Sequence, residues 1–328
     1  MKSRKTGEFE RIARIFAPLA SGWPGAFGLR DDAAVIRPTD GHEFVITTDT
    51  VVAGIHYVGD EPPHLIAQKL LRVNLSDLAS MGSRPRVFTL NVALPESVDD
   101  AWLERFAEGL ADDQRRFGIV LAGGDSVSTP GPVTLTVTAI GEVAMGTAAR
   151  RDGASAGDLV FVTGTIGDGA LGLRVLRGGI EGVRSADAAA LVERYHLPEP
   201  RLQAGQALAE VASAMIDVSD GLVADLGHLA EASSAGAVIE AGRVPLSGAA
   251  RKVLHADPGM METVLTGGDD YELLFTAAPG NGEGIDRISR DLGLPITKIG
   301  WLDTDKGVRV LGDDGNRLEL RHSGFTHG

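Results

Sequence analysis

Apolar and polar residues in the first half of the chain follow two different periods. Residues 133–143 read VTLTVTAIGEV, and this alternation predicts a strand with one buried face and one face of threonines. Residues 63–81 and 101–117 repeat apolar side chains every three or four positions, which predicts two amphipathic helices. Segments 43–48, 87–94 and 119–122 predict three more strands. An opening helix is expected with Phe9, Ile12, Ile15, Phe16 and Leu19 on one face.

The second half also alternates helical and extended patterns. Strands are predicted at 159–163, 272–277 and 296–301, and helices at 201–211, 222–232 and 284–292. The small, basic stretch 146–157 is typical of a linker, so we expect one domain over 1–148 and another over 149–328. Long alternating strands favour mixed or antiparallel sheets. The predicted fold class is therefore α+β, with two α/β domains whose sheets pack against helices.

Composition excludes several classes of function. The chain of 328 residues has no cysteine, which rules out disulfides, thiolate metal sites and cysteine nucleophiles. A formal net charge of −14 argues against a nucleic-acid partner, because such binding depends on cationic patches. The sequence has no apolar run of roughly 20 residues and no secretory signal pattern. We therefore expect no membrane partner and a cytoplasmic location.

Several acids follow or interrupt apolar segments, beside glycine, serine or threonine. They are Asp31, Asp32, Asp49, Asp77, Asp125, Asp217, Asp220, Asp269 and Asp270. A carboxylate among apolar residues is costly to bury unless a cation compensates it, and Mg²⁺ prefers Asp oxygens with water and phosphate oxygens. Any one of these acids is more often a helix cap or a turn residue. These nine acids lie in six short segments, and six such segments in one chain favour a site for several metal ions that bridge to a polyanion such as ATP.

Motifs for other nucleotide enzymes are absent or ambiguous. The chain has neither the P-loop pattern nor the protein-kinase signatures. Residues 167–172, GDGALG, do match the Gly-x-Gly-x-x-Gly pattern of dinucleotide-binding proteins after a strand. No second strand ending in an acid follows about 20 residues later, so tight strand-to-helix packing is the favoured interpretation. A dinucleotide oxidoreductase is retained as an alternative.

Short motifs, most of them containing an acid, occur in a specific order along nearly the whole chain. They are GEF at 7–9, DDAA at 31–34, TTDT at 47–50, GIHY at 54–57, VNLSDLASMG at 73–82, GGDS at 123–126, VTGTIG at 162–167, IDVSDGL at 216–222 and GGDDYEL at 267–273. In this set the chain resembles the thiamine-monophosphate kinase family of the aminoimidazole ribonucleotide synthetase-like superfamily.

The resemblance implies a set of roles for numbered residues. Metal positions would be Asp32, Thr47, Thr48, Asp49, Asp77, Asp125, Asp217 and Asp220. Contacts to ATP would come from Gly124, Asp125, Arg151 and Ser219, and contacts to thiamine monophosphate from His56, Asp269 and Phe325. It also implies several Mg²⁺ ions, ATP as co-substrate, and a homodimer joined through the first-domain sheets. The first domain would bind ATP and metal, and the second would complete the active site.

The expected reaction is direct in-line transfer of the ATP γ-phosphoryl group to thiamine monophosphate, giving thiamine diphosphate. No catalytic side chain is required, because the acceptor phosphate oxygen is already ionised and the enzyme's task is alignment and charge neutralisation. The sequence departs from the family pattern at Arg30, where glycine is usual, at Ser126, where threonine is usual, and at Asp269, which is often glutamate. Alternatives are another ATP-dependent synthetase of the superfamily and a nonenzymatic nucleotide-binding regulator.

Overall fold

The threonine-rich segment 133–143 lies in a strand next to one edge of a four-stranded sheet in the first part of the molecule. The computed structural model describes residues 8–180, 182–322 and 324. Contacts divide the chain into a first unit, Met1–Leu78 with Arg84–Gly146, and a second unit, Ala79–Ser83 with Thr147–Gly328. The placement of Ala79–Ser83 in the second unit had no signal in the sequence.

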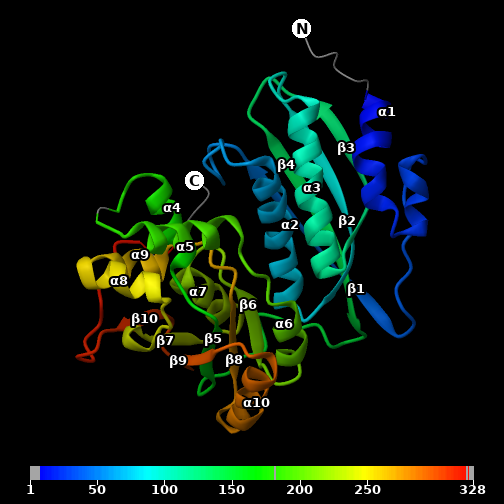
Figure 1. Cartoon of the computed structure of the whole chain (residues 1–328). Coiled ribbons are helices and arrows are strands. Elements are labelled where there is room, and N and C mark those ends of the chain that lie inside the picture. Colours follow the sequence, from blue (N-terminus) through cyan, green and yellow to red (C-terminus); the bar gives the residue numbers. More distant parts are fainter. Residues whose placement is uncertain (1–7, 181, 323, 325–328) are drawn as a thin grey trace. The chain divides into compact units, whose positions relative to one another are not determined.

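The sheet of the first unit has the order β1-β4-β2-β3. Its strands are β1 His42–Val52, β2 Arg84–Leu94, β3 Val120–Ser128 and β4 Thr134–Ala144. β4 pairs antiparallel with β1 and β2, whereas β2 and β3 run parallel. Mixed pairing confirms the predicted fold class. Helices α2 Pro63–Ser80 and α3 Asp100–Phe117 lie across one face of this sheet (Figure 1).

The two faces of this sheet differ in the way the alternation predicted. Val137 of β4 is completely buried on the helix side, together with Leu135, Ala139 and Leu90 of β2. Thr48 and Thr50 of β1 and the threonines of β4 face the other way, and Thr50 Oγ1 lies 2.8 Å from Thr136 Oγ1 across the strands. Ile46 is 63% exposed on this threonine face, which α2 and α3 leave uncovered.

Two predictions for the first unit were wrong in detail. The opening segment is not one helix: α1 Glu8–Arg11 passes into a π turn, η1 Ile12–Phe16, and a 3₁₀ turn, η2 Ala17–Ala20. Pro18 lacks the N–H that a continuing α-helix needs, and Phe9 is 86% exposed while Ile15, Phe16 and Leu19 are buried. The strand predicted at 119–122 instead runs from Val120 to Ser128, because Gly124 pairs closely with Leu90 of β2.

The second unit is built on a six-stranded mixed sheet with the order β10-β7-β9-β5-β8-β6. Its strands are β5 Leu159–Thr163, β6 Ala214–Asp217, β7 Gly236–Glu240, β8 Leu273–Ala277, β9 Ile296–Asp303 and β10 Gly307–Leu311. Its helices are α4 Asp168–Leu176, α5 Ser185–His196, α6 Leu202–Leu208, α7 Leu222–Ala232, α8 Gly248–Ala256, α9 Met260–Thr266 and α10 Gly282–Leu292. The 3₁₀ turns of the chain are completed by η3 Pro24–Leu29, η4 Ala241–Arg243 and η5 Pro279–Asn281.

The core of the second unit lies between this sheet and helix α7. Val162 of β5, Ile216 of β6 and Leu226 of α7 belong to one buried cluster. Phe161 and Phe275 occupy the opposite face, with ring centroids 5.3 Å apart. The strands β6, β7 and β10 and the helices α8 and α9 were not predicted, because each is too short to show a clear period. Helix α5, with 12 residues, was also missed.

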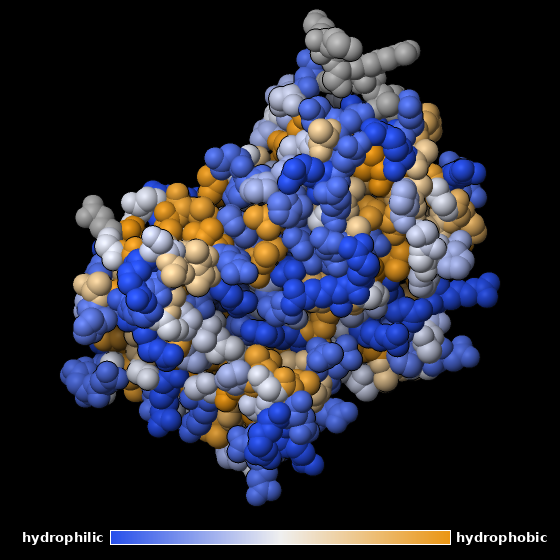
Figure 2. All heavy atoms as spheres, in the orientation of Figure 1, coloured by the Kyte–Doolittle hydropathy of each residue, from blue (hydrophilic) through white to orange (hydrophobic). Residues whose placement is uncertain are grey.

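The surface agrees with the composition. Hydrophilic residues cover most of the face shown in Figure 2, with smaller hydrophobic areas among them. Within residues 8–180, 182–322 and 324, no helix combines the length and the apolar character needed to cross a lipid bilayer.

A buried carboxylate on β4 holds the segment that precedes β1. Glu142 is 4% exposed and accepts hydrogen bonds from Thr39 N (3.1 Å), Thr39 Oγ1 (2.9 Å) and the guanidinium of Arg86. The Arg86 guanidinium also lies over the ring of Trp23, and Trp23 Nε1 donates to the carbonyl of Val35. This chain of contacts closes the loop that carries Asp31 and Asp32.

Replacing this carboxylate should therefore give a pH-dependent loss of stability. Burial raises the pKa of Glu142, but bonds from Thr39 and the nearby Arg86 outweigh it, so the net pKa lies below its ordinary value. We expect Glu142→Gln to lower the free energy of unfolding by about 2 kcal/mol at pH 7. A lowered folded-state pKa contributes stability above the unfolded-state pKa, and this contribution disappears as pH falls through the folded-state pKa.

Urea unfolding at pH 7 and near pH 3.5 measures the difference between wild type and variant. The exposed Glu108→Gln on α3 is the matched control and should change little at either pH. A difference for Glu142→Gln that is the same at both pH values would contradict the assignment.

Candidate active site

Two acids of the first unit meet beneath the sheet. Asp49 points to the helix side of β1, because Asp49 pairs with the buried Val137 of β4. Asp77 reaches it from α2, where its carboxylate hydrogen-bonds to Asp49 and accepts from the hydroxyl of Thr47. Burial, then the charge of Asp77 and the hydrogen bond to it, raise the pKa of Asp49 to about 7. The pair is therefore a half-buried site with excess negative charge.

This pair fits a divalent cation. Two carboxylates in contact repel each other when both are ionised, and a hard cation would relieve that repulsion. Among the described residues, no three acidic or histidine side chains lie close enough together to hold a metal ion. Asp49 and Asp77 could therefore supply part of a coordination shell, with water or phosphate oxygens completing it.

Thr48 and Asp125 lie on the other face of the same sheet. Thr48 Oγ1 donates to Val137 O at 3.1 Å and lies 3.0 Å from Thr138 Oγ1, away from Asp49. Asp125 on β3 pairs with Asn91, which pairs with Thr136 on the threonine face.

β1 and β3 are the two edges of the sheet, with β4 and β2 between them. Three strand spacings separate the edges by roughly 14 Å. The structure thus brings Thr47, Asp49 and Asp77 together and holds the side chains of Thr48 and Asp125 apart from them. Asp32 lies in an exposed loop, where its N–H donates to the carboxylate of Asp31.

The remaining predicted metal acids belong to the second unit. Asp217 ends β6 and is buried, and Ser219 and Asp220 form the turn that leads into α7. One carboxylate oxygen of Asp225, in the first turn of α7, accepts from the amides of Ser219 (3.0 Å), Asp220 (3.1 Å) and Gly221 (3.1 Å). The turn is thus fixed by an acid that was not predicted.

Burial and the charge of Asp220 raise the pKa of Asp225 to about 7, although the three amides act in the opposite direction. An Asp in the first turn of a helix, directly after a glycine-containing loop, is the sequence signal that could have identified this residue.

The loop with Asp269 is joined to this turn by backbone hydrogen bonds. Asp269 N donates to Ser219 O at 3.0 Å, Tyr271 N donates to Val218 O at 2.8 Å, and Val218 N donates to Glu272 O at 2.9 Å. The Tyr271 hydroxyl donates to the Asp269 carboxylate at 3.2 Å. Asp269, predicted to contact thiamine monophosphate, and Ser219, predicted to contact ATP, therefore lie on adjacent, hydrogen-bonded segments.

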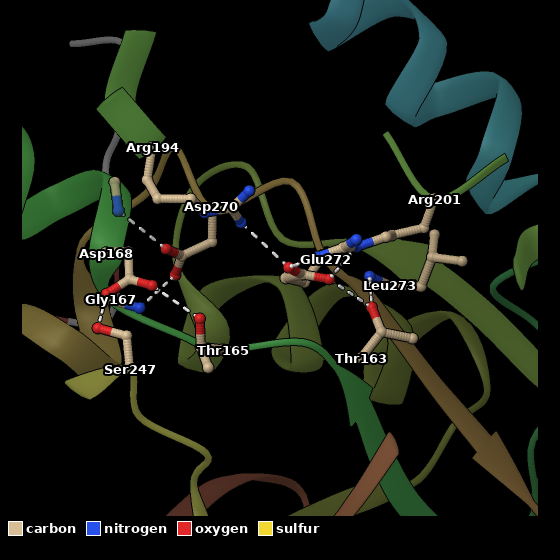
Figure 3. A network of polar contacts seen from close by, with 11 residues as sticks. Thr163, Thr165, Gly167, Asp168, Arg194, Arg201, Ser247, Asp270, Glu272 and Leu273 are labelled. Atoms are coloured by element: carbon tan, nitrogen blue, oxygen red, sulfur yellow. Dashed lines mark hydrogen bonds and ion pairs between the residues drawn. The ribbon is translucent and has the colours of Figure 1, made fainter. Parts of the chain in front are cut away.

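Two buried carboxylates, those of Asp270 and Glu272, follow Asp269, and each accepts hydrogen bonds from a different part of the second unit (Figure 3). Asp270 accepts from Gly167 N at 2.7 Å and Gly169 N at 3.1 Å. Glu272 accepts from Thr163 Oγ1 at 2.7 Å, Arg201 Nε at 2.7 Å and an Arg194 guanidinium nitrogen at 3.1 Å. Both carboxylates lie within the protein; Asp270 holds the middle of the loop and Glu272 holds its end at β8.

These contacts explain the Gly-x-Gly-x-x-Gly pattern at 167–172. The amides of Gly167 and Gly169, which a dinucleotide phosphate would need, already donate to Asp270. A Cβ at Gly169 would lie 2.2 Å from Asp269 O, and one at Gly172 would lie 2.2 Å from Leu191 O. The glycines permit close packing of α4, so this motif gives no support to a dinucleotide oxidoreductase.

The other predicted contacts are placed as follows. His56 Nδ1 accepts from Val52 N at 3.1 Å, so its proton lies on Nε2, which can act as a donor. Gly124 is necessary because a Cβ there would lie 1.9 Å from Leu90 O. Arg151 is exposed in the second unit, and its carbonyl accepts from the Ser233 hydroxyl. Phe325 lies outside the described residues.

Arg30 does not distort the loop before Asp31. Its φ of −112° and ψ of −2° are accessible to any residue, so the glycine usual in the family pattern is not needed here. The side chain is exposed. The departure therefore adds a charge beside Asp31 and Asp32 and leaves the backbone unconstrained.

Comparison with known proteins gives a consistent result. Residues 30–143 match the model of the AIR synthase related protein N-terminal domain, and residues 155–313 match the corresponding C-terminal domain. The thiamine-monophosphate kinase of Escherichia coli K12 is 41% identical over 323 residues, covering 98% of each chain.

Two solved structures are also similar. The thiamine-monophosphate kinase from Stenotrophomonas maltophilia superimposes with a TM-score of 0.81 at 40% identity, covering 88% of this chain and 91% of that one. A structure described as AaThiL complexed with AMPPCP and TMP superimposes with a TM-score of 0.78 at 30% identity over the whole of both chains.

Proposed function

The chain belongs to the thiamine-monophosphate kinase family, and we propose that it transfers the γ-phosphoryl group of ATP to thiamine monophosphate. The products are thiamine diphosphate and ADP. The observation that carries the proposal is 41% identity to a thiamine-monophosphate kinase over 98% of the chain. The AaThiL structure with AMPPCP, a nonhydrolysable ATP analogue, and TMP supports the same pair of substrates.

The chemistry needs little from protein side chains as acids or bases. The bond between the γ-phosphorus and its bridging oxygen breaks, and an oxygen of the acceptor phosphate forms the new bond. That oxygen is already ionised near neutral pH, so no proton has to be removed first. Donor and acceptor repel each other, and the residues of the site must align them and offset their charge.

Divalent ions, proposed to be Mg²⁺, would supply most of the positive charge when bound. Asp49 and Asp77 are the pair whose contact best fits such an ion, with Thr47 fixing the Asp77 carboxylate. Asp32, Thr48, Asp125, Asp217 and Asp220 remain proposed ligands from the family resemblance.

The remaining proposed contacts concern the two substrates. Ser219, Gly124, Asp125 and Arg151 are assigned to ATP; the planar guanidinium of Arg151 suits phosphate oxygens. His56 would donate from Nε2 to the acceptor, which agrees with its Nδ1 hydrogen bond to Val52 N. Asp269 and Phe325 complete the acceptor contacts.

We further propose that the first unit binds ATP and metal and forms a homodimer through its sheet, and that the second unit completes the active site. The uncovered threonine face, with Ile46 63% exposed and Val127 of β3 50% exposed, supports this use of the sheet. The chain has no cysteine and so needs no oxidising compartment for disulfides, and we propose the cytoplasm.

The activity itself is tested by one assay. Purified protein incubated with ATP, MgCl₂ and thiamine monophosphate should form thiamine diphosphate and ADP in equal amounts, detected by phosphorus NMR. Omitting the acceptor should stop ADP formation, and replacing it with unphosphorylated thiamine should give no diphosphate. ATP binding without any thiamine diphosphate would favour a nucleotide-binding regulator, and ATP turnover on another acceptor would favour a different synthetase of the superfamily.

Asp77→Asn should separate catalysis from folding. We expect kcat to fall by about 100-fold or more, because the amide cannot share a divalent cation with Asp49 as a carboxylate does. The melting temperature should change little, since the substitution removes charge repulsion while the amide oxygen can still accept from Thr47. The exposed Asp112→Asn on α3 is the matched control and should keep wild-type kcat. Wild-type turnover in Asp77→Asn would refute the metal assignment.

Direct transfer also predicts a stereochemical outcome. Use of ATP made chiral at the γ-phosphorus with oxygen isotopes should give thiamine diphosphate with inverted configuration, because a single in-line displacement inverts the centre. Retention would mean two displacements and a covalent phosphoenzyme.

A further inference from the structure

The Gly267–Glu272 loop has an unusual backbone conformation at Asp269, the residue proposed to contact thiamine monophosphate. Asp269 has a φ of +71° and Tyr271 has a φ of +52°, both in the left-handed region that non-glycine residues rarely adopt. Such a conformation persists only when surrounding contacts over-determine it. Asp270, between these two residues, is the first place to look for those contacts.

Asp270 is fully buried, and both of its carboxylate oxygens are used. Oδ2 accepts from Gly167 N and Oδ1 accepts from Gly169 N, at the start of α4 (Figure 3). Burial raises the pKa of this carboxyl well above its ordinary value, although the two amides act in the opposite direction. The side chain therefore connects the middle of the loop to the first turn of a helix about 100 residues earlier in the chain.

Close backbone packing reinforces this connection on both sides of the loop. A Cβ at Gly169 would lie 2.2 Å from Asp269 O, and a Cβ at Gly267 would lie 2.3 Å from the Cβ of Ala170. On the other side, a Cβ at Gly268 would lie 2.0 Å from Ser219 O. The loop is thus packed between α4 and the Ser219 turn, with little room to shift.

We propose that Asp270 is a positioning residue for the phosphate acceptor: it anchors the loop to α4 and so sets where Asp269 presents its carboxylate. Tyr271, held in the same strained stretch, orients that carboxylate through its hydroxyl. The proposal rests on the proposed function, because the role of Asp269 toward thiamine monophosphate is part of that function. Asp270 itself stays inside the protein and touches no substrate.

Asp270→Asn tests this role by steady-state kinetics. The amide keeps the size of the side chain, but its NH₂ group faces one of the two backbone amides, so one hydrogen bond is lost. We expect KM for thiamine monophosphate to rise about 10-fold or more, while KM for ATP stays within about two-fold. A residue with a merely structural role would not produce this split between the two substrates.

Asp168→Asn is the matched control. Asp168 is equally buried in the same network, but it accepts from Thr165 Oγ1 at 2.7 Å and Ser247 Oγ at 2.6 Å, which are outside the 267–272 loop. We expect it to lower the melting temperature and to leave KM for thiamine monophosphate at the wild-type value. A wild-type KM for the acceptor in Asp270→Asn, or an equal rise in KM for ATP, would overturn the proposal.

A second measurement keeps the inference testable apart from the activity. Amide hydrogen exchange at Asp269 and Tyr271 should be faster in Asp270→Asn than in wild type, and not faster in Asp168→Asn. Unchanged exchange would overturn the anchoring role even in an active enzyme. If wild type forms no thiamine diphosphate while exchange responds as expected, the proposed function has failed and the anchor has not.

Should Asp270→Asn not fold, Asp270→Glu replaces it. This variant keeps the carboxylate but adds one methylene, which would push the loop away from α4. The same rise in KM for the acceptor is expected, and a wild-type KM would overturn the proposal.

Discussion

Burying a carboxylate is costly unless donors replace the water it loses, and three acids of the second unit that hold loops of the candidate site meet this requirement. Asp225 accepts hydrogen bonds from the amides of the Ser219 turn, and Asp270 accepts from the amides at the start of α4. Glu272 accepts from Thr163 and from two arginines. Each carboxylate thereby fixes one stretch of backbone. The loops that carry Ser219, Asp220 and Asp269 are held by these acids, which are not themselves assigned to any ligand.

In the first unit Glu142 is satisfied in the same way by Thr39 and Arg86, but one pair of carboxylates is left under-compensated. Asp49 and Asp77 contact each other, and the pKa of Asp49 rises to about 7 in consequence of burial and this neighbour. The contrast between these two kinds of carboxylate is informative. Carboxylates with backbone or arginine donors serve the structure, whereas a pair of carboxylates facing each other is suited to a divalent cation.

Sequence patterns predicted the long elements well and the short ones poorly. The 133–143 alternation and the two long helices have enough residues to show a period, whereas β6 has four residues and β7 and β10 have five. Pro18 interrupts an apolar pattern that otherwise resembles a helix. The acids were identified by their neighbours in the sequence, but their faces were not: Thr48 and Asp49 are adjacent and point to opposite sides of β1. The anchor Asp270 could not be told from a ligand, because the amides of Gly167 and Gly169 reach it from about 100 residues earlier in the chain. Asp225 accepts from amides only four to six residues before it, so its position in the first turn of α7 was a readable signal that was missed.

The distance in the chain between Asp270 and the glycines of α4 has a consequence for exchange of parts among related proteins. A swap of residues 267–273 alone, or of 164–172 alone, with a relative that lacks the acid or the glycines would leave either a buried acid or two helix-terminal amides without a partner. Insertions between them, by contrast, are unconstrained by this contact. The two short segments are therefore coupled although a hundred residues separate them, and a chimera built from relatives that differ there should carry both from the same parent.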